Sequence, residues 1–364
     1  MNGIMPAEGG SASGGKNFDK RLKTIPDAVW AKIAQIEELK AQWATGAQLS
    51  PQLLGRLKRG VLITSTGAST RIEGSQLSDE DVERFIRGLT VQKFAARDRQ
   101  EVQGYYELLN NVFDAWQNIK FSESTVKHLH KELLKYVEKD QRHRGDYKKG
   151  ENTVAMTDAK GKVLSIVFNP TPAYLAPKET QELIDWTETN LKIRKYNPLL
   201  VVGNFIVEFL NIHPFQDGNG RLSRVLTNLL LLKEGYVYMP YVSHEKLIED
   251  NKSEYYITLR RSQKTIKSKA EDITSWLDYF LGILQQQSKM AIDLLNKQDI
   301  EKLLSPKQLL VWEYLQKVKE ATPLEISKKA KVARPTVNQV LDKLLKYKKI
   351  ERIGQGSATR YKKL

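Results

Sequence analysis

The sequence predicts a mainly α-helical protein that also contains two short β-hairpins. Along most of the 364 residues, apolar side chains recur every three or four positions, as on the buried face of a helix. Two stretches depart from this spacing, near 153–168 and 350–361, where pairs of β-prone runs flank turns that contain glycine. A chain of this length is expected to form two or three domains with ordinary cores.

The composition excludes several kinds of site. The chain has no cysteine, so it can form neither a disulfide nor a thiolate metal site. No uninterrupted apolar run reaches the roughly 18 to 20 residues needed to span a bilayer, and no apolar signal segment follows Met1. We therefore expect a cytoplasmic protein that does not bind a membrane.

The first part of the chain combines a polar tail with a helical region. Residues 1–16 are rich in Gly, Ser and Ala, which predicts a disordered tail. The tail nearly matches a phosphate-binding P-loop, but Asn17 replaces the required Ser or Thr and no strand precedes it, so we reject that site. Residues 17–120 are expected to form an N-terminal helical region, with helices over 26–43, 51–65, 77–92 and 95–116.

The middle of the chain alternates helices with one hairpin. Helical spacing covers 121–137, and Ser122 is expected to cap that helix. The β-prone runs 153–156 and 163–168 flank a turn at 158–162, and a lone hairpin in a helical protein must pack on something or bind something. Further helices are predicted over 199–212, 222–232 and 243–265, followed by a last helix that carries Trp276, Leu277, Tyr279 and Phe280.

The turn between the two apolar helices 199–212 and 222–232 has the composition of a phosphate site. Gly218 and Gly220 allow the backbone to approach an anion closely and to take positive φ. The amides that begin the second helix are unpaired and attract anions themselves. Arg221 and Arg224 lie three positions apart on that helix, so both can face one ligand.

The same turn offers a base and a metal ligand. His213 is its only group whose ordinary pKa permits proton transfer near neutral pH. Asp217 suits Mg²⁺, which takes one or two carboxylates together with substrate oxygens. The stretch 213–224 therefore indicates a site for a polyphosphate and its metal.

The stretch 213–224 also resembles the signature of the Fic family, His-x-Phe-x-Asp/Glu-Gly-Asn-Gly-Arg-x-x-Arg, and matches it at every defining position. Fic proteins mostly transfer AMP from ATP to a hydroxyl of a target protein. The resemblance extends over 25–288 and implies a Fic-type helical bundle whose catalytic core covers 121–290. It is imperfect at Ile206 and Leu210, because these positions are often polar in relatives.

The resemblance implies a role for each residue of the signature. It makes His213 the catalytic base, and it makes Asp217 the ligand of Mg²⁺. It implies an ATP site in which Arg224 holds the γ-phosphate and the other phosphates lie on Gly218, Asn219, Gly220 and Arg221.

Upstream of the signature, residues 69–74 resemble the inhibitory motif of the family, Ser/Thr-x-x-x-Glu-Gly/Asn. On pattern alone, Glu73 is an exposed acid before a loop, and Gly74 ends a helix. The resemblance implies that Glu73 pairs with Arg224 and occupies the space of the ATP γ-phosphate. Because a bidentate Arg–carboxylate pair competes directly with an Arg–phosphate pair, the chain is expected to be autoinhibited.

Two further segments acquire a role from the resemblance. The hairpin at 153–168 is similar to the Fic flap, which binds the target protein through main-chain hydrogen bonds, and a purely structural hairpin remains the alternative. The segment 249–256 resembles the Fic region where an Asn and a Tyr-Tyr pair lie near the nucleotide base. Asn251 offers a donor and an acceptor to an adenine edge, and a solvated helix residue is the alternative there.

The C-terminal residues 303–364 form a basic segment. They hold twelve lysines and three arginines against four glutamates and one aspartate. Helices predicted over 306–318, 323–329 and 333–347, followed by the second hairpin, look like a winged helix-turn-helix domain. In that fold the third helix enters the DNA major groove, and its residues placed to reach base edges are Arg334, Thr336, Asn338 and Gln339. DNA binding is therefore one expectation, and docking to a protein is the other.

Three functions stay open at this point. The first is an autoinhibited protein adenylyltransferase that modifies a Ser, Thr or Tyr hydroxyl. The second is a related phosphotransfer, such as removal of AMP with Glu73 orienting a water molecule. The third is a DNA-binding transcriptional regulator whose Fic core senses a nucleotide. Relatives with this layout often dimerise, so a homodimer is a further expectation.

Overall fold

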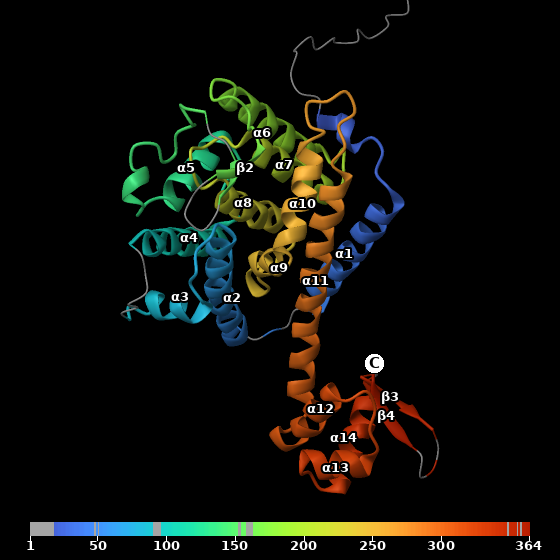
Figure 1. The fold of residues 1–364 in the computed structure, drawn as a ribbon. Coiled ribbons are helices and arrows are strands. Elements are labelled where there is room, and N and C mark those ends of the chain that lie inside the picture. Colours follow the sequence, from blue (N-terminus) through green and yellow to red (C-terminus); the bar gives the residue numbers. More distant parts are fainter. Residues whose placement is uncertain are drawn as a thin grey trace, which may run out of the picture. The chain divides into compact units, whose positions relative to one another are not determined.

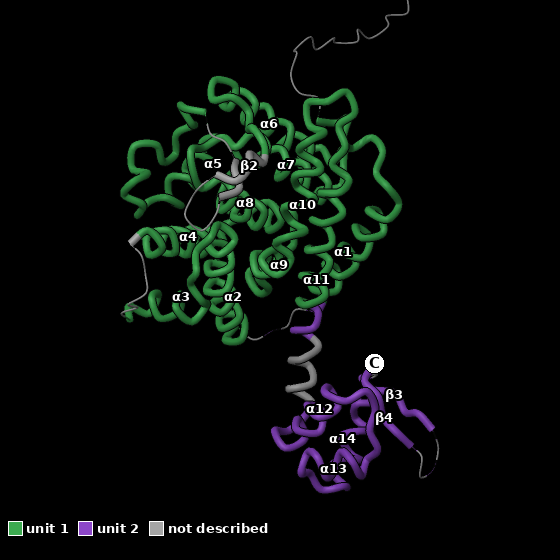
Figure 2. The backbone as a smooth tube through the Cα atoms, in the orientation of Figure 1, with its two compact units in different colours: residues 1–45, 50–291 green, residues 46–49, 292–364 purple. Residues whose placement is uncertain are grey.

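The computed structural model describes residues 18–46, 49, 51–89, 96–151, 154–157, 163–347, 349–354, 356 and 359–364. The predicted tail 1–16 and the predicted hairpin turn 158–162 lie outside these residues. The chain divides into two compact units, coloured green and purple in Figure 2. The first unit comprises Met1–Thr45 and Ser50–Ala291, and the second comprises Gly46–Leu49 and Ile292–Leu364. The predicted division of the first unit at residue 120 stays a prediction.

The first unit is a bundle of helices with one small sheet (Figure 1). Among the described residues, no helix combines the length and the apolar character that crossing a bilayer requires. The α-helices of this unit are α1 (Asp27–Gly46), α2 (Pro51–Ile72), α3 (Asp79–Ile86), α4 (Ala96–Ala115), α5 (Glu123–Leu133), α6 (Ala176–Ile193), α7 (Pro198–Ile212), α8 (Asn219–Lys233), α9 (His244–Asp250), α10 (Lys252–Gln263) and the first part of α11 (Thr274–Leu303). The short 3₁₀ helices are η1 (Phe18–Leu22), η2 (Glu138–Asp140) and η3 (Met239–Tyr241).

Helix α7 forms the centre of the first unit, and every residue from Leu199 to Ile212 is buried. The helix begins at Pro198, where a missing N–H costs nothing, and the Asn197 side chain accepts a hydrogen bond from the Leu199 amide at 2.9 Å. It packs against α6, α8 and α10. Because α7 is mostly apolar and is covered on all sides by its neighbours, it is a rigid support for the residue at its C-terminal end, His213.

Helix α8 brings the predicted phosphate site into contact with the N-terminal helices. It packs against α2, α4, α5, α7 and α9. Its N-cap is Gly218, which has a positive φ of 78°. Segments that are more than a hundred residues apart in the sequence therefore meet around the beginning of α8.

The first hairpin is confirmed. Strand β1 (Val154–Thr157) pairs antiparallel with β2 (Val163–Phe168), so that Val154 lies opposite Phe168 and Thr157 lies opposite Val163. This is the one two-stranded sheet of the first unit among the described residues.

The second unit consists of three helices followed by a hairpin, as predicted. Helices α12 (Pro306–Lys317), α13 (Pro323–Ala330) and α14 (Arg334–Lys346) pack against one another. Strand β3 (Ile350–Ile353) pairs antiparallel with β4 (Arg360–Lys363), whereas the second strand was predicted to begin at residue 358, outside the described residues. Ala321, between α12 and α13, adds a bridge to β4 because it exchanges two main-chain hydrogen bonds with Tyr361, of 3.0 and 2.8 Å. The core of this unit includes Val311, Leu315, Ile326, Val337, Val340, Leu341, Leu344 and Ile350.

The prediction that the second helix ends at residue 65 was wrong, because α2 continues to Ile72. The Ser, Thr and Gly residues of its last turns are poor helix formers. In the structure the Thr70 hydroxyl donates to the carbonyl oxygens of Thr66 and Gly67 at 3.0 and 2.9 Å, and the Ser65 hydroxyl pairs with that of Ser243 at 2.8 Å. Packing against α4 and α9 then outweighs the weak helix propensity.

The prediction of one helix over 243–265 was also wrong, because two helices, α9 and α10, meet at Asn251. Asn251 has φ −116° and ψ 29°, which is not helical. Its side-chain amide donates to the Leu247 carbonyl oxygen at 2.9 Å. This bond offers the backbone an alternative to continuing the helix, which is the reason that Asn favours helix ends.

Candidate active site

A cavity of about 620 Å³ opens where the end of α2, the turn before α8 and one face of α10 come together. Most of the residues that the sequence singled out line it. These are Glu73, His213, Asp217, Gly218, Asn219, Gly220 and Arg221. A volume of this size accommodates a small-molecule ligand such as a nucleotide.

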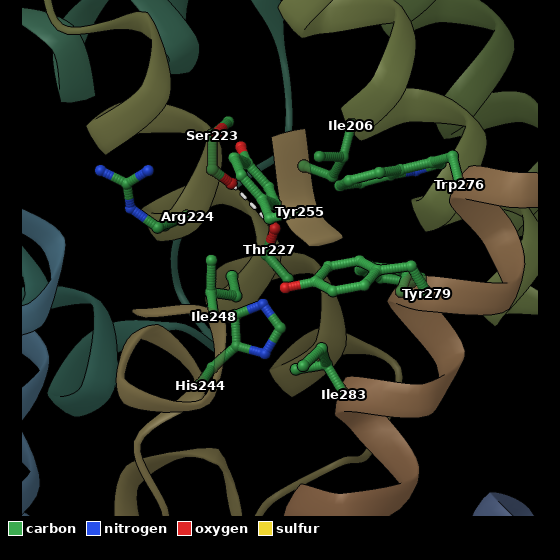
Figure 3. A pocket seen from close by; sticks show the side chains of 11 residues that line it. Ile206, Ser223, Arg224, Thr227, His244, Ile248, Tyr255, Trp276, Tyr279 and Ile283 are labelled. Atoms are coloured by element: carbon green, nitrogen blue, oxygen red, sulfur yellow. Dashed lines mark hydrogen bonds between the residues drawn. The ribbon is translucent and has the colours of Figure 1, made fainter. Parts of the chain in front are cut away.

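A second cavity lies deeper in the first unit, where Arg224 reaches its edge. Figure 3 shows the rings of His244 and Tyr279 near each other across it, while the Arg224 guanidinium points away. Its volume is only about 10 Å³, room for one water molecule. The Tyr279 hydroxyl and the His244 Nδ1 have no hydrogen-bond partner among the described residues, so this cavity fits a buried water and is too small for a nucleotide.

His213 ends α7 with its backbone in the left-handed region, at φ 51° and ψ 62°. Its Nδ1 lies 3.4 Å from the Leu210 carbonyl oxygen, and a carbonyl can only accept a hydrogen bond. The proton therefore resides on Nδ1, which leaves the lone pair on Nε2. Burial lowers the pKa of His213 to about 4, and the positive charge of Lys148 acts in the same direction. The imidazole is neutral at pH 7 and can accept a proton.

The turn that follows His213 is held by the Asn219 side chain. Its Oδ1 accepts a hydrogen bond from the Phe215 amide at 3.0 Å, and its Nδ2 donates to the Phe215 carbonyl oxygen at 2.8 Å. The side chain is 1% exposed. Asn219 was predicted to bind nucleotide, and the structure shows that its side chain is occupied in closing the turn, which leaves its main-chain amide for a ligand.

His130 on α5 supports the same turn from the other side, and it was not among the residues predicted for the site. Its Nδ1 accepts a hydrogen bond from the Gly145 amide at 2.8 Å, so its Nε2 carries the proton and donates to the Asp217 carbonyl oxygen at 3.0 Å. Its ring stacks on Phe215 with centroids 3.8 Å apart. The weak signal in the sequence is a polar residue on the apolar face of a helix, between Leu129 and Leu133.

Asp217 faces the cavity with its carboxylate engaged by donors. Gly218 donates its amide to Oδ1 at 2.6 Å, and Arg97 of α4 donates to Oδ2 at 3.0 Å. Burial raises the pKa of Asp217, but the charge of Arg221, the Gly218 amide and the charge of Arg97 lower it more, so the pKa lies below its ordinary value. Asp217 is therefore ionised at neutral pH.

The donor set around Asp217 decides whether Mg²⁺ fits there. Among the described residues, no group of three or more His, Cys, Asp and Glu side chains is arranged to hold a metal ion. A single carboxylate is sufficient for Mg²⁺ when phosphate oxygens and water complete the shell. Asp217 meets that requirement once Arg97, whose side chain is 55% exposed, moves off Oδ2.

The structure places Glu73 and Arg224 in contact. Arg224 is 2% exposed, and its Nη2 donates to Glu73 Oε1 at 2.8 Å. The pair uses one carboxylate oxygen rather than the expected two, because Ser69 accepts from Arg224 Nε and Nη2 at 2.8 and 2.9 Å. Burial is the largest single influence and lowers the pKa of Arg224, but Glu73, Tyr255 and Tyr105 together raise it above its ordinary value, so the guanidinium stays charged.

Glu73 is held at the cavity by the main chain that ends α2. The Glu73 amide donates to the Thr70 carbonyl oxygen, the Gly74 amide to that of Arg71 and the Ser75 amide to that of Thr70, each at 3.1 Å. Gly74 has φ 108°, which fits its predicted place at the end of a helix. Across the cavity, a Cβ at Gly220 would lie only 2.3 Å from Glu73 Oε1, so only glycine leaves room for the carboxylate there.

Two further positions complete the comparison with the expectation. Arg221 lines the cavity and pairs with Glu101 of α4 at 2.9 Å and with Asp217 at 3.4 Å. Asn251 is exposed and does not line the cavity. The described residues of α10 that line it include Tyr255 and Tyr256, along with Arg260 and Gln263.

Comparison with known proteins identifies the family to which the site is similar. Residues 120–231 match the model of the Fic/DOC family. The chain is 32% identical over 81 residues to a probable protein adenylyltransferase of Aquifex aeolicus, a match that covers 22% of this chain and 24% of the relative. It is 36% identical over 94 residues to a Fido domain-containing protein of Dictyostelium discoideum, covering 23% of this chain and 61% of that protein. The chain thus spans about a quarter of one relative and less than two thirds of the other.

Solved structures extend the similarity to the fold. A Fic family protein from Desulfovibrio desulfuricans G20 superimposes with a TM-score of 0.60 at 24% identity, over 94% of this chain and 97% of that one. A Fic domain-containing signalling protein from Bacteroides thetaiotaomicron superimposes with a TM-score of 0.60 at 22% identity, over 72% of this chain and 97% of that one. These likenesses confirm the predicted, mainly helical fold class.

Proposed function

The chain contains a Fic domain over residues 120–231, and from this premise we propose that it is a protein adenylyltransferase. It transfers AMP from ATP to a Ser, Thr or Tyr hydroxyl of a target protein and releases pyrophosphate. The observation that carries the proposal is a nucleotide-sized cavity in which a neutral histidine, an ionised carboxylate and the N-terminus of a helix face one another. Protein adenylyltransferases among the similar proteins support it.

The geometry supports an in-line displacement at the α-phosphorus. Nε2 of His213 removes the proton of the target hydroxyl, whose oxygen forms a bond to the α-phosphorus while the bond to the bridging oxygen of pyrophosphate breaks. The amides of residues 219–221 and the Arg221 side chain hold the phosphates at the N-terminus of α8. Asp217 is the residue that would hold Mg²⁺, which supplies positive charge against the charge that develops on the phosphoryl oxygens.

We propose further that Glu73 inhibits this activity. In the contact seen here, Arg224 is held by a carboxylate and by Ser69. A γ-phosphate needs the same guanidinium, so ATP and Glu73 compete for it. The resting enzyme is expected to bind ATP weakly or in an unproductive position.

The hairpin of β1 and β2 is proposed to bind the target. An edge strand binds an extended peptide through its main chain, which leaves little dependence on the side chains of the peptide. A structural hairpin without this role remains the alternative.

The test uses α-labelled ATP, Mg²⁺ and the full chain. The wild type should label itself or a target weakly, Glu73→Gly strongly and His213→Ala not at all. Glu73→Gln removes the charge and keeps the size of the side chain, so it should also label more strongly than the wild type. Equal labelling by the wild type, Glu73→Gly and His213→Ala would contradict the proposal. In an intact-mass measurement, an adduct of about 329 Da, the mass of AMP less water, would identify donor and reaction together.

Removal of AMP is a second candidate that one observation favours. Arg224 contacts only Oε1 of Glu73, so the other carboxylate oxygen of this partly exposed residue is free to orient a water molecule. The test supplies a pre-modified target and measures release of AMP. Release by the wild type that disappears in Glu73→Gln favours this candidate, and release by neither protein excludes it.

For the second unit we propose a winged helix-turn-helix domain that binds DNA. Three packed helices, a hairpin and the bridge from Ala321 to β4 support this arrangement. On α14 the side chains of Arg334, Asn338 and Gln339 are exposed, and 303–364 is strongly basic. Binding of a DNA duplex by the full chain should weaken steeply with salt and with Arg334→Ala. If the full chain binds no DNA duplex even at low salt, docking to a protein is the better interpretation of the second unit.

We also propose a homodimer, on the basis of the family layout. Light scattering coupled to size-exclusion chromatography measures the mass directly. A mass of one chain across the working concentration range contradicts it.

A further inference from the structure

We propose that Lys148 is a positioning residue for His213, because it binds the main-chain carbonyl on each side of that histidine. The inference rests on the proposed function, since it assigns Lys148 to the site of that reaction. Lys148 lies in the loop between η2 and β1, more than sixty residues before the signature, and no motif of the sequence includes it.

Two hydrogen bonds connect Lys148 to the signature. Its main-chain amide donates to the Pro214 carbonyl oxygen at 2.9 Å. Its Nζ donates to the Ile212 carbonyl oxygen at 3.3 Å. Residues 212 and 214 are the two neighbours of His213, so Lys148 holds the backbone immediately before and after the proposed base.

This support matters because His213 has an unfavourable backbone conformation. A residue other than glycine rarely adopts a φ of 51°, and it does so only where its surroundings hold it there. The His213 amide donates to the Phe209 carbonyl oxygen at 2.9 Å, which fixes the end of α7. The two bonds from Lys148 fix the start of the turn that follows. Together they determine the direction in which the imidazole leaves the backbone.

The side chain of Lys148 is specific in this role, whereas its amide is not. Any residue other than proline could donate its main-chain N–H to Pro214. Burying an ammonium group is costly, and Lys148 is only 3% exposed. Burial lowers the pKa of Lys148 to about 8, and the charge of Lys267 acts in the same direction. The charges of Glu151 and Glu179 act in the opposite direction. Lys148 therefore remains mostly charged at pH 7, so the buried site holds a cation next to the His213 backbone.

The charge of Lys148 also has a chemical effect on His213. Beyond burial and the bond to Leu210, the groups that act on the imidazole are Lys148, Glu73 and Asp217. The two carboxylates favour the protonated ring, and Lys148 opposes it. A general base must be unprotonated, so Lys148 counteracts the acidic residues that the phosphate and metal sites require.

The experiment removes the ammonium and follows His213 directly. Lys148→Met keeps most of the aliphatic stem, Lys148→Arg keeps a charged donor, and Lys149→Met changes the exposed neighbour as the matched control. The chain has five histidines, so the His213 signal in the NMR spectrum of histidine-labelled protein is the one missing from His213→Ala. This titration needs neither ATP nor catalysis.

In wild type, Lys148→Arg and Lys149→Met, the His213 ring should stay neutral from pH 8 down to about pH 5. In Lys148→Met it should begin to protonate at a higher pH. When the same changes are made in Glu73→Gly protein, AMP transfer by Lys148→Met should fall about tenfold even at neutral pH, because the neutral base is no longer held in position, with little change in the KM for ATP. Lys148→Arg should recover most of the rate.

The inference is overturned if folded Lys148→Met shows the same His213 titration as wild type and the same pH dependence of kcat. Should Lys148→Met not fold, Lys148→Gln takes its place, since it also lacks the charge. If Glu73→Gly itself transfers no AMP, the proposed function fails, and the NMR titration still decides whether Lys148 controls His213.

Discussion

The contact between Glu73 and Arg224 predicts how strongly ATP binding is suppressed. The perturbation is Glu73→Gln, which removes the negative charge and retains the size of the side chain. Arg224 is 2% exposed while the side chain of Glu73 is 36% exposed, so the pair lies between a buried and a surface ion pair. We therefore assign it about 1–2 kcal/mol, discounted for the exposure of Glu73. Without that competition, ATP should bind roughly 5 to 30 times more tightly.

Two measurements check this magnitude. Isothermal titration with a non-hydrolysable ATP analogue, at fixed Mg²⁺, gives the affinity of wild type and variant. Thermal unfolding, with and without nucleotide, compares the stability of wild type and variant. Without nucleotide the variant should be less stable than wild type, because the buried guanidinium of Arg224 loses its counter-charge. With saturating nucleotide the order should reverse, since the tighter ligand stabilises more.

Glu80→Gln is the control, because Glu80 is an exposed carboxylate in the first turn of α3. It should change neither the affinity nor the stability order. Equal affinity of wild type and Glu73→Gln for the analogue would refute the reasoning, since it would show that the γ-phosphate does not use Arg224. The same conclusion would follow if nucleotide stabilised both proteins equally.

Further expectations concern the metal, the turn and the pH dependence. Arg97→Ala frees Oδ2 of Asp217 for Mg²⁺. Because Arg97 is largely exposed, the Mg²⁺ concentration at half-saturation, measured with nucleotide present, should fall by only about two- to fivefold. An unchanged titration curve would contradict this. Asn219→Ala removes two hydrogen bonds to the Phe215 main chain and should cost about 1–3 kcal/mol in urea denaturation. A loss below about 0.5 kcal/mol would show that the turn relaxes. In Glu73→Gly protein, AMP transfer should be lost only as the pH falls towards about 4 or below. Burial lowers the pKa of His213, and removal of Glu73 lowers it further. A loss centred near pH 6.5 would indicate an exposed histidine instead.

The fold was largely predictable because local patterns determine it. Helix α7 is mostly apolar, and the turn that follows contains two glycines, so a buried helix, a turn and a second helix were expected at residues 199–232. Where the prediction was wrong, contacts distant in the sequence outweighed local propensity. The last turns of α2 are helical because they pack on α9, which is about 180 residues later in the chain.

The candidate site was predictable only where it follows a contiguous motif. His213 and Arg224 belong to one stretch of twelve residues, and Glu73 belongs to a second short pattern. By contrast, Arg97 and His130 reach the same turn from α4 and α5, and nothing in their local sequence indicates which carbonyl or carboxylate they contact. Such partners appear only when the helices are placed in space.

The way in which α2 ends determines how the proposed inhibition would be relieved. Glu73 follows the last helical residue and is anchored by three terminal main-chain hydrogen bonds. Helix ends fray at low free-energy cost, without movement of the rest of the bundle. Each fraying event releases Arg224 for a moment, so inhibition of this kind is leaky, with a basal rate set by how often one helical turn opens. Hydrogen exchange at the amides of residues 73–75 would measure that frequency, and a partner that unwinds this single turn would suffice to switch the enzyme on.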